Sequence, residues 1–174
     1  MFKLILKNGI IAGLIVETAM LITMASGVHG GLLGMALGYL SMLIAFSMIF
    51  VGIKKYRDVE NGGMINFGQA FVIGFGIAII ASIFYVIGWE IYLFFTNYTF
   101  MNEYVAKYIE SKRAAGASLE EIAKLQTQMS QMAIQYKNPI FRTLMTFSEI
   151  LPIGLLVSLI CAFILKNPKA FPAK

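Results

Sequence analysis

The chain has 174 residues, of which 59% are hydrophobic and only 13% are charged, and its mean hydropathy is +0.77. A soluble domain of this length needs more polar surface to stay dispersed in water, so the composition excludes that class. The formal net charge of +5 would suit a nucleic-acid partner, but the basic residues flank apolar blocks, as in multi-pass membrane proteins. We therefore predict an all-α, polytopic membrane protein that contacts lipids and no nucleic acid.

Four apolar blocks predict four transmembrane helices within a single membrane domain that covers residues 1–174. The blocks run from about residue 8 to 26, 32 to 53, 67 to 95 and 143 to 165, and each is long enough to cross a hydrocarbon core of roughly 30 Å. Gly27–Gly31 predicts a tight turn, and Lys54–Asn66 predicts a short polar loop. The basic N-terminal stretch lacks a clean cleavage site, which favours a retained first helix over a signal peptide.

The distribution of basic residues predicts the orientation of the spans. With four spans, the N-terminus, the loop after the second span and the C-terminus share one side, and that side carries Lys3, Lys7, Lys54, Lys55, Arg57, Lys166, Lys169 and Lys174. The positive-inside rule therefore places both termini in the cytoplasm. The long third loop weakens the contrast, because it carries six basic residues against four glutamates.

Residues 97–142 predict an extracytoplasmic helical hairpin between the third and fourth spans. Gly116 suits a helix end, Ser118 and Glu121 form a capping-box pattern, and Asn138–Pro139 suits the end of the second helix. That helix carries an apolar stripe formed by Ile122, Leu125, Met129, Met132 and Tyr136. The stripe would pack on the sister helix or at the lipid interface, or alternatively would dock a periplasmic partner.

Small residues recur at every fourth position in all four spans, which predicts close packing of the helices in a compact bundle. These residues are Gly9 and Gly13; Gly30, Gly34 and Gly38; Ala70, Gly74, Ala78 and Ser82; and Gly154, Ser158 and Ala162. A ridge that remained facing lipid would alternatively support a homo-oligomer.

Three glutamates lie within the predicted spans and form the candidate intramembrane polar site: Glu17, Glu90 and Glu149. An ionised carboxylate in hydrocarbon costs several kcal/mol, so such a group is paired, hydrated or protonated. The functional hypothesis is a polar cavity in which the carboxylates bind a cation or carry protons. The structural alternative places Glu90 and Glu149 at the interface beside Trp89 and Tyr92, and keeps Glu17 as a neutral, packed acid.

The loop after the second span suggests contacts with lipid headgroups. Lys54, Lys55 and Arg57 are the candidate headgroup contacts, since arginine pairs well with phosphate. Gly62–Gly63 would supply a turn, and Asn66 would cap the third helix.

Residue patterns typical of catalysis are absent from the sequence. Cys161 is the single cysteine, and His29, the single histidine, lies in a glycine turn, so neither a disulfide nor a metal site is expected. The glycine-rich stretches lack the polar surroundings of nucleotide fingerprints. We expect no enzyme activity, no catalytic residue and no cofactor.

The motif GIKKYRD at Gly52–Asp58, followed by a glycine pair and INFGQAF at Ile65–Phe71, resembles a bacterial family of small four-span membrane proteins catalogued as a domain of unknown function. The pattern G-x-S-x-E-E-I at Gly116–Ile122, the pair Asn138–Pro139 and the ending AFILKNP agree with that family. The resemblance covers nearly the whole chain and implies a multi-pass protein of the bacterial inner membrane. It implies no activity, ligand or catalytic residue.

Two hypotheses for the function follow. The first is a structural or accessory membrane protein that acts through contacts with lipids or with membrane or periplasmic proteins. The second is a small proton-coupled transporter that uses Glu17, because a glutamate in the first of four helices resembles the small multidrug-resistance transporters. The long third loop departs from those transporters.

Overall fold

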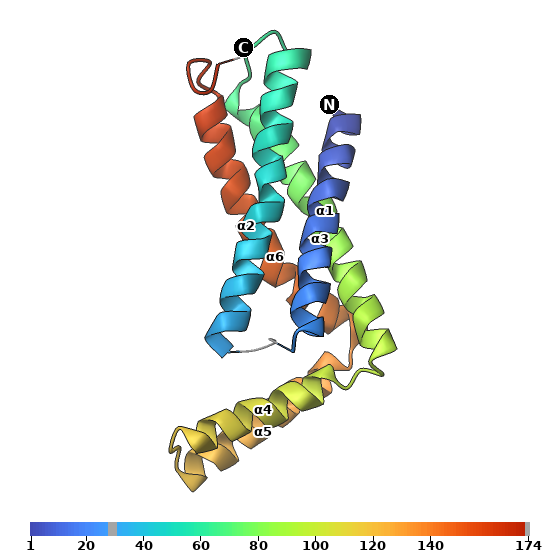
Figure 1. The fold of residues 1–174 in the computed structure, drawn as a ribbon, viewed down its shortest axis with the longest axis vertical. Coiled ribbons are helices and arrows are strands. Elements are labelled where there is room, and N and C mark those ends of the chain that lie inside the picture. Colours follow the sequence, from blue (N-terminus) through green and yellow to red (C-terminus); the bar gives the residue numbers. More distant parts are fainter. Residues whose placement is uncertain (28–30, 173–174) are drawn as a thin grey trace. The chain divides into compact units, whose positions relative to one another are not determined.

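The computed structural model describes residues 1–27 and 31–172, and this part of the chain is all-α (Figure 1). Its elements are α1 (Phe2–Ala25), α2 (Gly31–Lys55), a π-helical turn η1 (Tyr56–Glu60), α3 (Phe67–Phe95), α4 (Phe100–Ala114), α5 (Leu119–Tyr136) and α6 (Pro139–Leu165). Four helical segments of the described chain are long and apolar enough to cross a membrane: α1, α2 with η1, α3 and α6. The predicted four-span architecture with a helix pair between the third and fourth spans is confirmed. The turn predicted around His29 falls on residues 28–30, outside the described chain.

The chain divides into two compact units, which are described separately. The bundle unit comprises Met1–Ile87 and Phe147–Lys174, and the hairpin unit comprises Gly88–Thr146. Helices α3 and α6 each contribute residues to both units.

The interior of the bundle unit is built from branched and aromatic side chains. Phe46, Ile49, Ile73 and Ile77 have no solvent-exposed surface. In contrast, large apolar side chains such as Leu32 and Phe163 are exposed over 83% and 64% of their surface. Lipid can solvate such an apolar exterior, whereas exposing it to water would be unfavourable. The bundle unit therefore has the surface expected of a membrane protein.

Small residues allow α1 to approach α3 closely. A Cβ atom at Gly9 would lie 2.6 Å from Cβ of Ile80, and one at Gly13 would lie 2.6 Å from Cβ of Phe84. Such close approach increases the dispersion contacts that hold helices together in lipid. The ridge predicted for the second span differs, because a Cβ atom at Gly38 would meet nothing within 4 Å.

Two helix boundaries differ from the predictions. Helix α1 begins at Phe2 rather than near residue 8, so Lys3 and Lys7 form part of its first turns. Helix α6 begins at Pro139 rather than near residue 143. Proline suits the first position of a helix because its missing N–H would have had no partner there. In addition, Oδ1 of Asn138 accepts a 2.9 Å hydrogen bond from the amide of Ile140, which caps the new helix.

The predicted polar loop after the second span is shorter than expected. Residues 56–60 continue from α2 as the π-helical turn η1, and only the following residues form the loop. Gly62 and Gly63 adopt φ angles of +63° and +83°, as their predicted turn requires. Oδ1 of Asn66 accepts a 2.8 Å hydrogen bond from the amide of Gln69, which confirms the predicted cap of α3.

The predicted helical hairpin is formed by α4 and α5, which lie side by side (Figure 1). Between them Gly116 adopts a φ of +84°. The capping box is complete: the amide of Glu121 donates to Oγ of Ser118 at 3.2 Å, and the amide of Ser118 donates to Oε2 of Glu121 at 2.8 Å. That backbone donor lowers the pKa of the Glu121 carboxyl.

The apolar stripe of α5 faces its sister helix. Ile122 and Tyr136 are buried at its two ends, and Met101 and Ile109 are buried on α4. The remaining stripe residues between them are half-buried. The stripe therefore forms the interior of the helix pair.

The close approach of α1 and α3 can be tested with one pair of variants. Gly13→Ala should destabilise the protein by about 1–3 kcal/mol, because the added methyl group overlaps the rigid base of Phe84. Gly38→Ala makes the same chemical change where space is open, and should be neutral or stabilising. Unfolding in mixed detergent and SDS micelles, followed by circular dichroism, would measure both. Equal stability of the two variants would contradict the packing described here.

Candidate functional site

A bidentate ion pair in the hairpin unit joins Glu90 to Arg142. Nε of Arg142 donates to Oε1 of Glu90, and Nη2 donates to Oε2, both at 2.6 Å. Arg142 is buried, and the side chain of Glu90 is 29% exposed. The two parallel hydrogen bonds form the bidentate geometry in which guanidinium and carboxylate groups interact most strongly.

The other donors and the face of the same guanidinium group are also engaged. Nη1 of Arg142 donates to the backbone carbonyl of Tyr136 at 3.1 Å. The guanidinium carbon lies 5.0 Å from the ring centre of Tyr98 and 5.8 Å from that of Tyr136, within the range of cation–π attraction. The hydroxyl of Tyr136 accepts a 2.6 Å hydrogen bond from Nε1 of Trp89. We call these five residues, Trp89, Glu90, Tyr98, Tyr136 and Arg142, the hairpin-base network.

The network gives Glu90 a structural partner that the sequence did not reveal. Both carboxylate oxygens of Glu90 accept hydrogen bonds from Arg142. The predicted aromatic surroundings are present, since the ring of Trp89 stacks on Tyr92 with centres 5.4 Å apart. Glu90 therefore supports the fold of the hairpin unit, and its carboxylate is already neutralised.

Glu17 has different surroundings. It lies in α1, in the bundle unit, and its Oε2 is buried without a hydrogen-bond partner among the described residues. The neighbouring hydroxyl of Thr18 donates to the carbonyl of Leu14 at 2.7 Å and so is engaged within the helix. Oε2 of Glu17, a half-buried residue, is thus the one buried side-chain nitrogen or oxygen atom in the described chain that has no hydrogen-bond partner.

Glu149 lies on α6 in the bundle unit and is exposed. Within the described residues, no hydrogen bond or ion pair joins it to Glu17. The same part of the chain contains no group of three or more His, Cys, Asp or Glu side chains placed to hold a metal ion. Of the three predicted intramembrane glutamates, only Glu17 has a buried side-chain oxygen without a hydrogen-bond partner among the described residues.

Arg57 is the second buried arginine, and its side chain is 1% exposed. Its Nε donates to Asp58, whose carboxylate also forms an ion pair with Lys54. Its Nη1 donates to the carbonyls of Leu165 at 3.3 Å and Ala170 at 2.9 Å, and Nη2 donates to that of Phe171 at 2.5 Å.

These contacts assign Arg57 a role different from the predicted headgroup contact. The π-helical turn lies between Lys55 and Asn61, and it places Arg57 inside the protein rather than at its surface. Its donors then hold the end of α6 and the following tail. Lys54 is half-buried in its ion pair, whereas Lys55 is exposed and still suits contact with headgroups.

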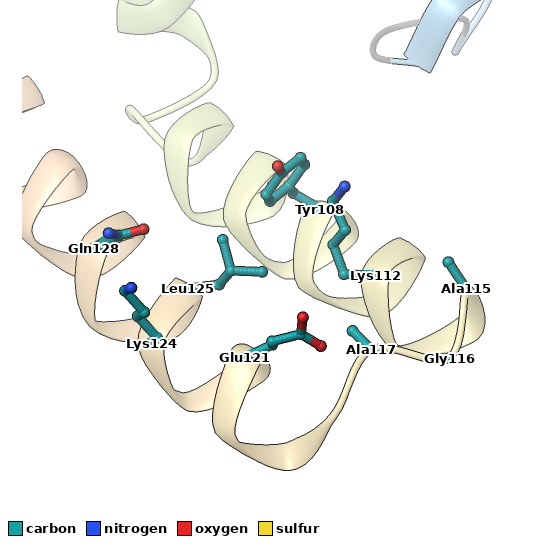
Figure 2. Close-up of a pocket in the computed structure, with 9 residues that line it drawn as sticks. All are labelled: Tyr108, Lys112, Ala115, Gly116, Ala117, Glu121, Lys124, Leu125 and Gln128. Carbon is teal, nitrogen blue, oxygen red and sulfur yellow. The ribbon is translucent and has the colours of Figure 1, made fainter.

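A groove of about 630 Å³ lies near the tip of the helix pair, as Figure 2 shows. It is lined by Tyr108, Lys112, Ala115, Gly116, Ala117, Glu121, Lys124, Leu125 and Gln128. Figure 2 shows Tyr108 and Lys112 extending from α4, opposite Leu125 of α5. The groove is open and lined by cationic, aromatic and amide groups, which suits a polar surface better than an enclosed reaction site.

Comparison with known proteins matches residues 7–167 to a family described as a protein of unknown function, DUF4199. The match confirms the expected resemblance to a domain of unknown function that covers most of the chain. No curated protein and no solved structure matched the chain.

The structural role of Glu90 can be tested by removing its charge. Glu90→Gln should destabilise the protein by about 1–3 kcal/mol, because Arg142 would keep a buried charge with a weaker acceptor. Glu149→Gln is the matched control, since it makes the same change at an exposed carboxylate. Hydrogen exchange of the α4 and α5 amides in detergent would localise the effect. Unchanged exchange in Glu90→Gln would contradict the structural role.

Proposed function

We propose that this chain, which belongs to the DUF4199 family of unknown function, is a structural or accessory membrane protein that acts through contacts with lipids or with other membrane or periplasmic proteins. The observation that carries the proposal is the hairpin-base network. In this network the charged side chains of Glu90 and Arg142 form a structural contact with each other.

The features of the hairpin suit a stable helix pair that presents its outer surface for contacts, rather than a reactive site. Its apolar stripe is turned inward, its loop is closed by a complete capping box, and its base is fixed by a buried arginine. The charged residues that remain outside are spread along α4 and α5. These features support a protein without catalytic activity or cofactor of its own, which contributes a membrane bundle and a rigid helix pair to its surroundings.

We place the protein in the bacterial inner membrane with both termini in the cytoplasm and the helix pair on the opposite side. One end of the bundle unit supports this orientation. The N-terminal amine forms a 3.1 Å ion pair with Glu60, and Arg57 donates to the carbonyls of Ala170 and Phe171, so the N-terminus, the η1 segment and the tail as far as Phe171 share one end. Basic residues concentrate in the same three segments.

The orientation can be tested with two single cysteines in a Cys161→Ala background. Val59→Cys lies at the exposed end of η1, and Ser130→Cys lies on the exposed side of α5. An impermeant thiol reagent added to intact spheroplasts should label position 130, and should label position 59 only after the membrane is opened. Labelling of both positions in intact spheroplasts would overturn the proposed topology.

Proton-coupled transport is the second candidate, and a specific observation favours it. The Oε2 atom of Glu17 is buried in a candidate membrane span without a partner among the described residues. An unpartnered polar atom in such a setting carries a free-energy cost that a bound cation or a transferred proton would relieve. Under this hypothesis Glu17 releases a proton when a cation binds, and takes one up when the cation leaves.

Glu17→Gln separates the two candidates. The amide keeps the shape of the acid but is unable to exchange a proton, so a transporter would lose every pH-driven flux while its stability remained. An accessory protein would keep its stability and would show no Glu17 titration. Infrared difference spectra across neutral pH, with Glu17→Gln as the blank, detect the carboxyl band directly. A Glu17 carboxyl band that changes with pH favours transport. A carboxyl band that does not change with pH favours the accessory role.

A further inference from the structure

A line of rings runs along one side of α4. Phe100, Tyr104 and Tyr108 are spaced four residues apart, and their successive ring centres are both 6.2 Å apart with nearly parallel planes. Nζ of Lys112, one turn further on, lies 5.5 Å from the ring centre of Tyr108. We call these four residues the aromatic ridge.

The inward side of α4 carries the buried residues Met101 and Ile109. The aromatic ridge runs beside it: Phe100 packs edge-on against Trp89 with ring centres 4.7 Å apart, and Tyr108 and Lys112 line the open groove towards α5. Tyr104, in contrast, is 40% exposed, and Phe100 and Tyr108 are partly exposed. The opposite flank of α4 has a different chemistry: Ala106, Glu110 and Arg113 line a second open groove there. Helix α4 thus carries rings on one flank and mainly polar or small residues on the other.

The chain adjacent to the ridge is adapted to the edge of a bilayer. The candidate span α3 ends at Phe95, and the ridge begins at Phe100. At this junction the last two residues of α3, Phe94 and Phe95, and the following Tyr98 are exposed over 65%, 77% and 47% of their surface. Exposed rings at the end of a span are typical of the interface between hydrocarbon and water.

The ridge residues match the same interface. Tyrosine has an apolar ring and a polar hydroxyl, and therefore favours the headgroup region over either water or hydrocarbon. Lysine extends its apolar stem along the acyl boundary and keeps its charge among phosphates. Apart from Arg142, which is buried and paired with Glu90, residues 97–142 carry five basic and four acidic side chains, and Lys112 at the end of the ridge supplies a cation that anionic headgroups complement.

We propose that the aromatic ridge lies in the headgroup region of the membrane, so that α4 rests along the lipid surface on its ring-bearing flank. The inference rests on the proposed accessory function and names its partner at this site as the bilayer itself. The exposed parts of Phe100, Tyr104 and Tyr108 then lie among headgroups, while the flank that carries Arg113 and Glu110 stays in water.

Two spin-label positions on α4 test the proposal in the full-length protein, in a Cys161→Ala background. Ser111→Cys lies three residues after Tyr108 and seven after Tyr104, hence on the ring-bearing flank, and it leaves the ridge intact. Ala106→Cys lies on the opposite flank, in the second groove. Both positions are exposed. The protein is reconstituted in vesicles of phosphatidylcholine and phosphatidylglycerol, and collisions of each label with oxygen and with a water-soluble nickel chelate are measured.

Oxygen concentrates in lipid and the chelate in water, so the oxygen-to-nickel ratio at position 111 should exceed that at position 106 several-fold. The double replacement Tyr104→Ser and Tyr108→Ser should then lower the ratio at 111 towards that at 106. Equal ratios at both positions in the unmodified ridge would overturn the proposal, because the ridge would be in water. Low collision rates with both reagents at 111 would overturn it in favour of a protein contact.

These outcomes are separate from the fate of the accessory function itself. If the ridge is in water, the lipid contact is wrong. The accessory function is still supported in that case if the infrared band of Glu17 does not change with pH. A titrating Glu17 favours transport whatever the position of the ridge.

Discussion

A buried guanidinium group needs acceptors for its N–H donors within the protein. In the bundle unit, Arg57 meets this requirement at the end that we propose to be cytoplasmic, and the packing of that end depends on it. The side chain is 1% exposed, and its acceptors are Asp58 and three backbone carbonyls at the end of α6 and in the tail. The last carbonyls of a helix have no partner within it, so the arginine and the helix end satisfy each other. The contact fixes the second span against the fourth. In the hairpin unit, the buried Arg142 likewise connects distant parts of the chain, with Glu90 as its acceptor.

Features encoded by neighbouring residues could be predicted from the sequence. The spans follow from the length and hydropathy of four blocks, and the Ser118–Glu121 capping box and the Gly62–Gly63 turn each lie within a few residues. The two arginine contacts could not be predicted in this way. Glu90 and Arg142 are 52 residues apart, and Arg57 and Leu165 are 108 apart, so no periodicity relates them. Their meeting depends on the fold as a whole.

In the candidate site, too, local sequence patterns could be predicted but long-range contacts could not. Sequence reasoning selected three glutamates by their depth in apolar blocks, but depth alone does not distinguish a paired carboxylate from an unpartnered one. Glu90 is paired with Arg142. The sequence had placed Arg142 in the loop before the fourth span, but α6 begins at Pro139, before its apolar block, and so includes this arginine. Glu17 retained an unpartnered oxygen among the described residues. A proline at the start of a helix was the one local signal that could have extended α6 to include Arg142.

The distance along the chain between Arg57 and its acceptors also sets an order of events during synthesis. Arg57 emerges from the ribosome more than a hundred residues before the carbonyl of Leu165 exists. Until then the guanidinium group has only Asp58 from its final set of partners, and the energetically accessible place for it is the phosphate layer of the membrane. The burial of Arg57 with its full set of acceptors therefore has to await the last helix and the tail. A chain that stops before Ala170 would lack two of the carbonyls that accept hydrogen bonds from Arg57 in the complete fold, so its arginine would still need other acceptors.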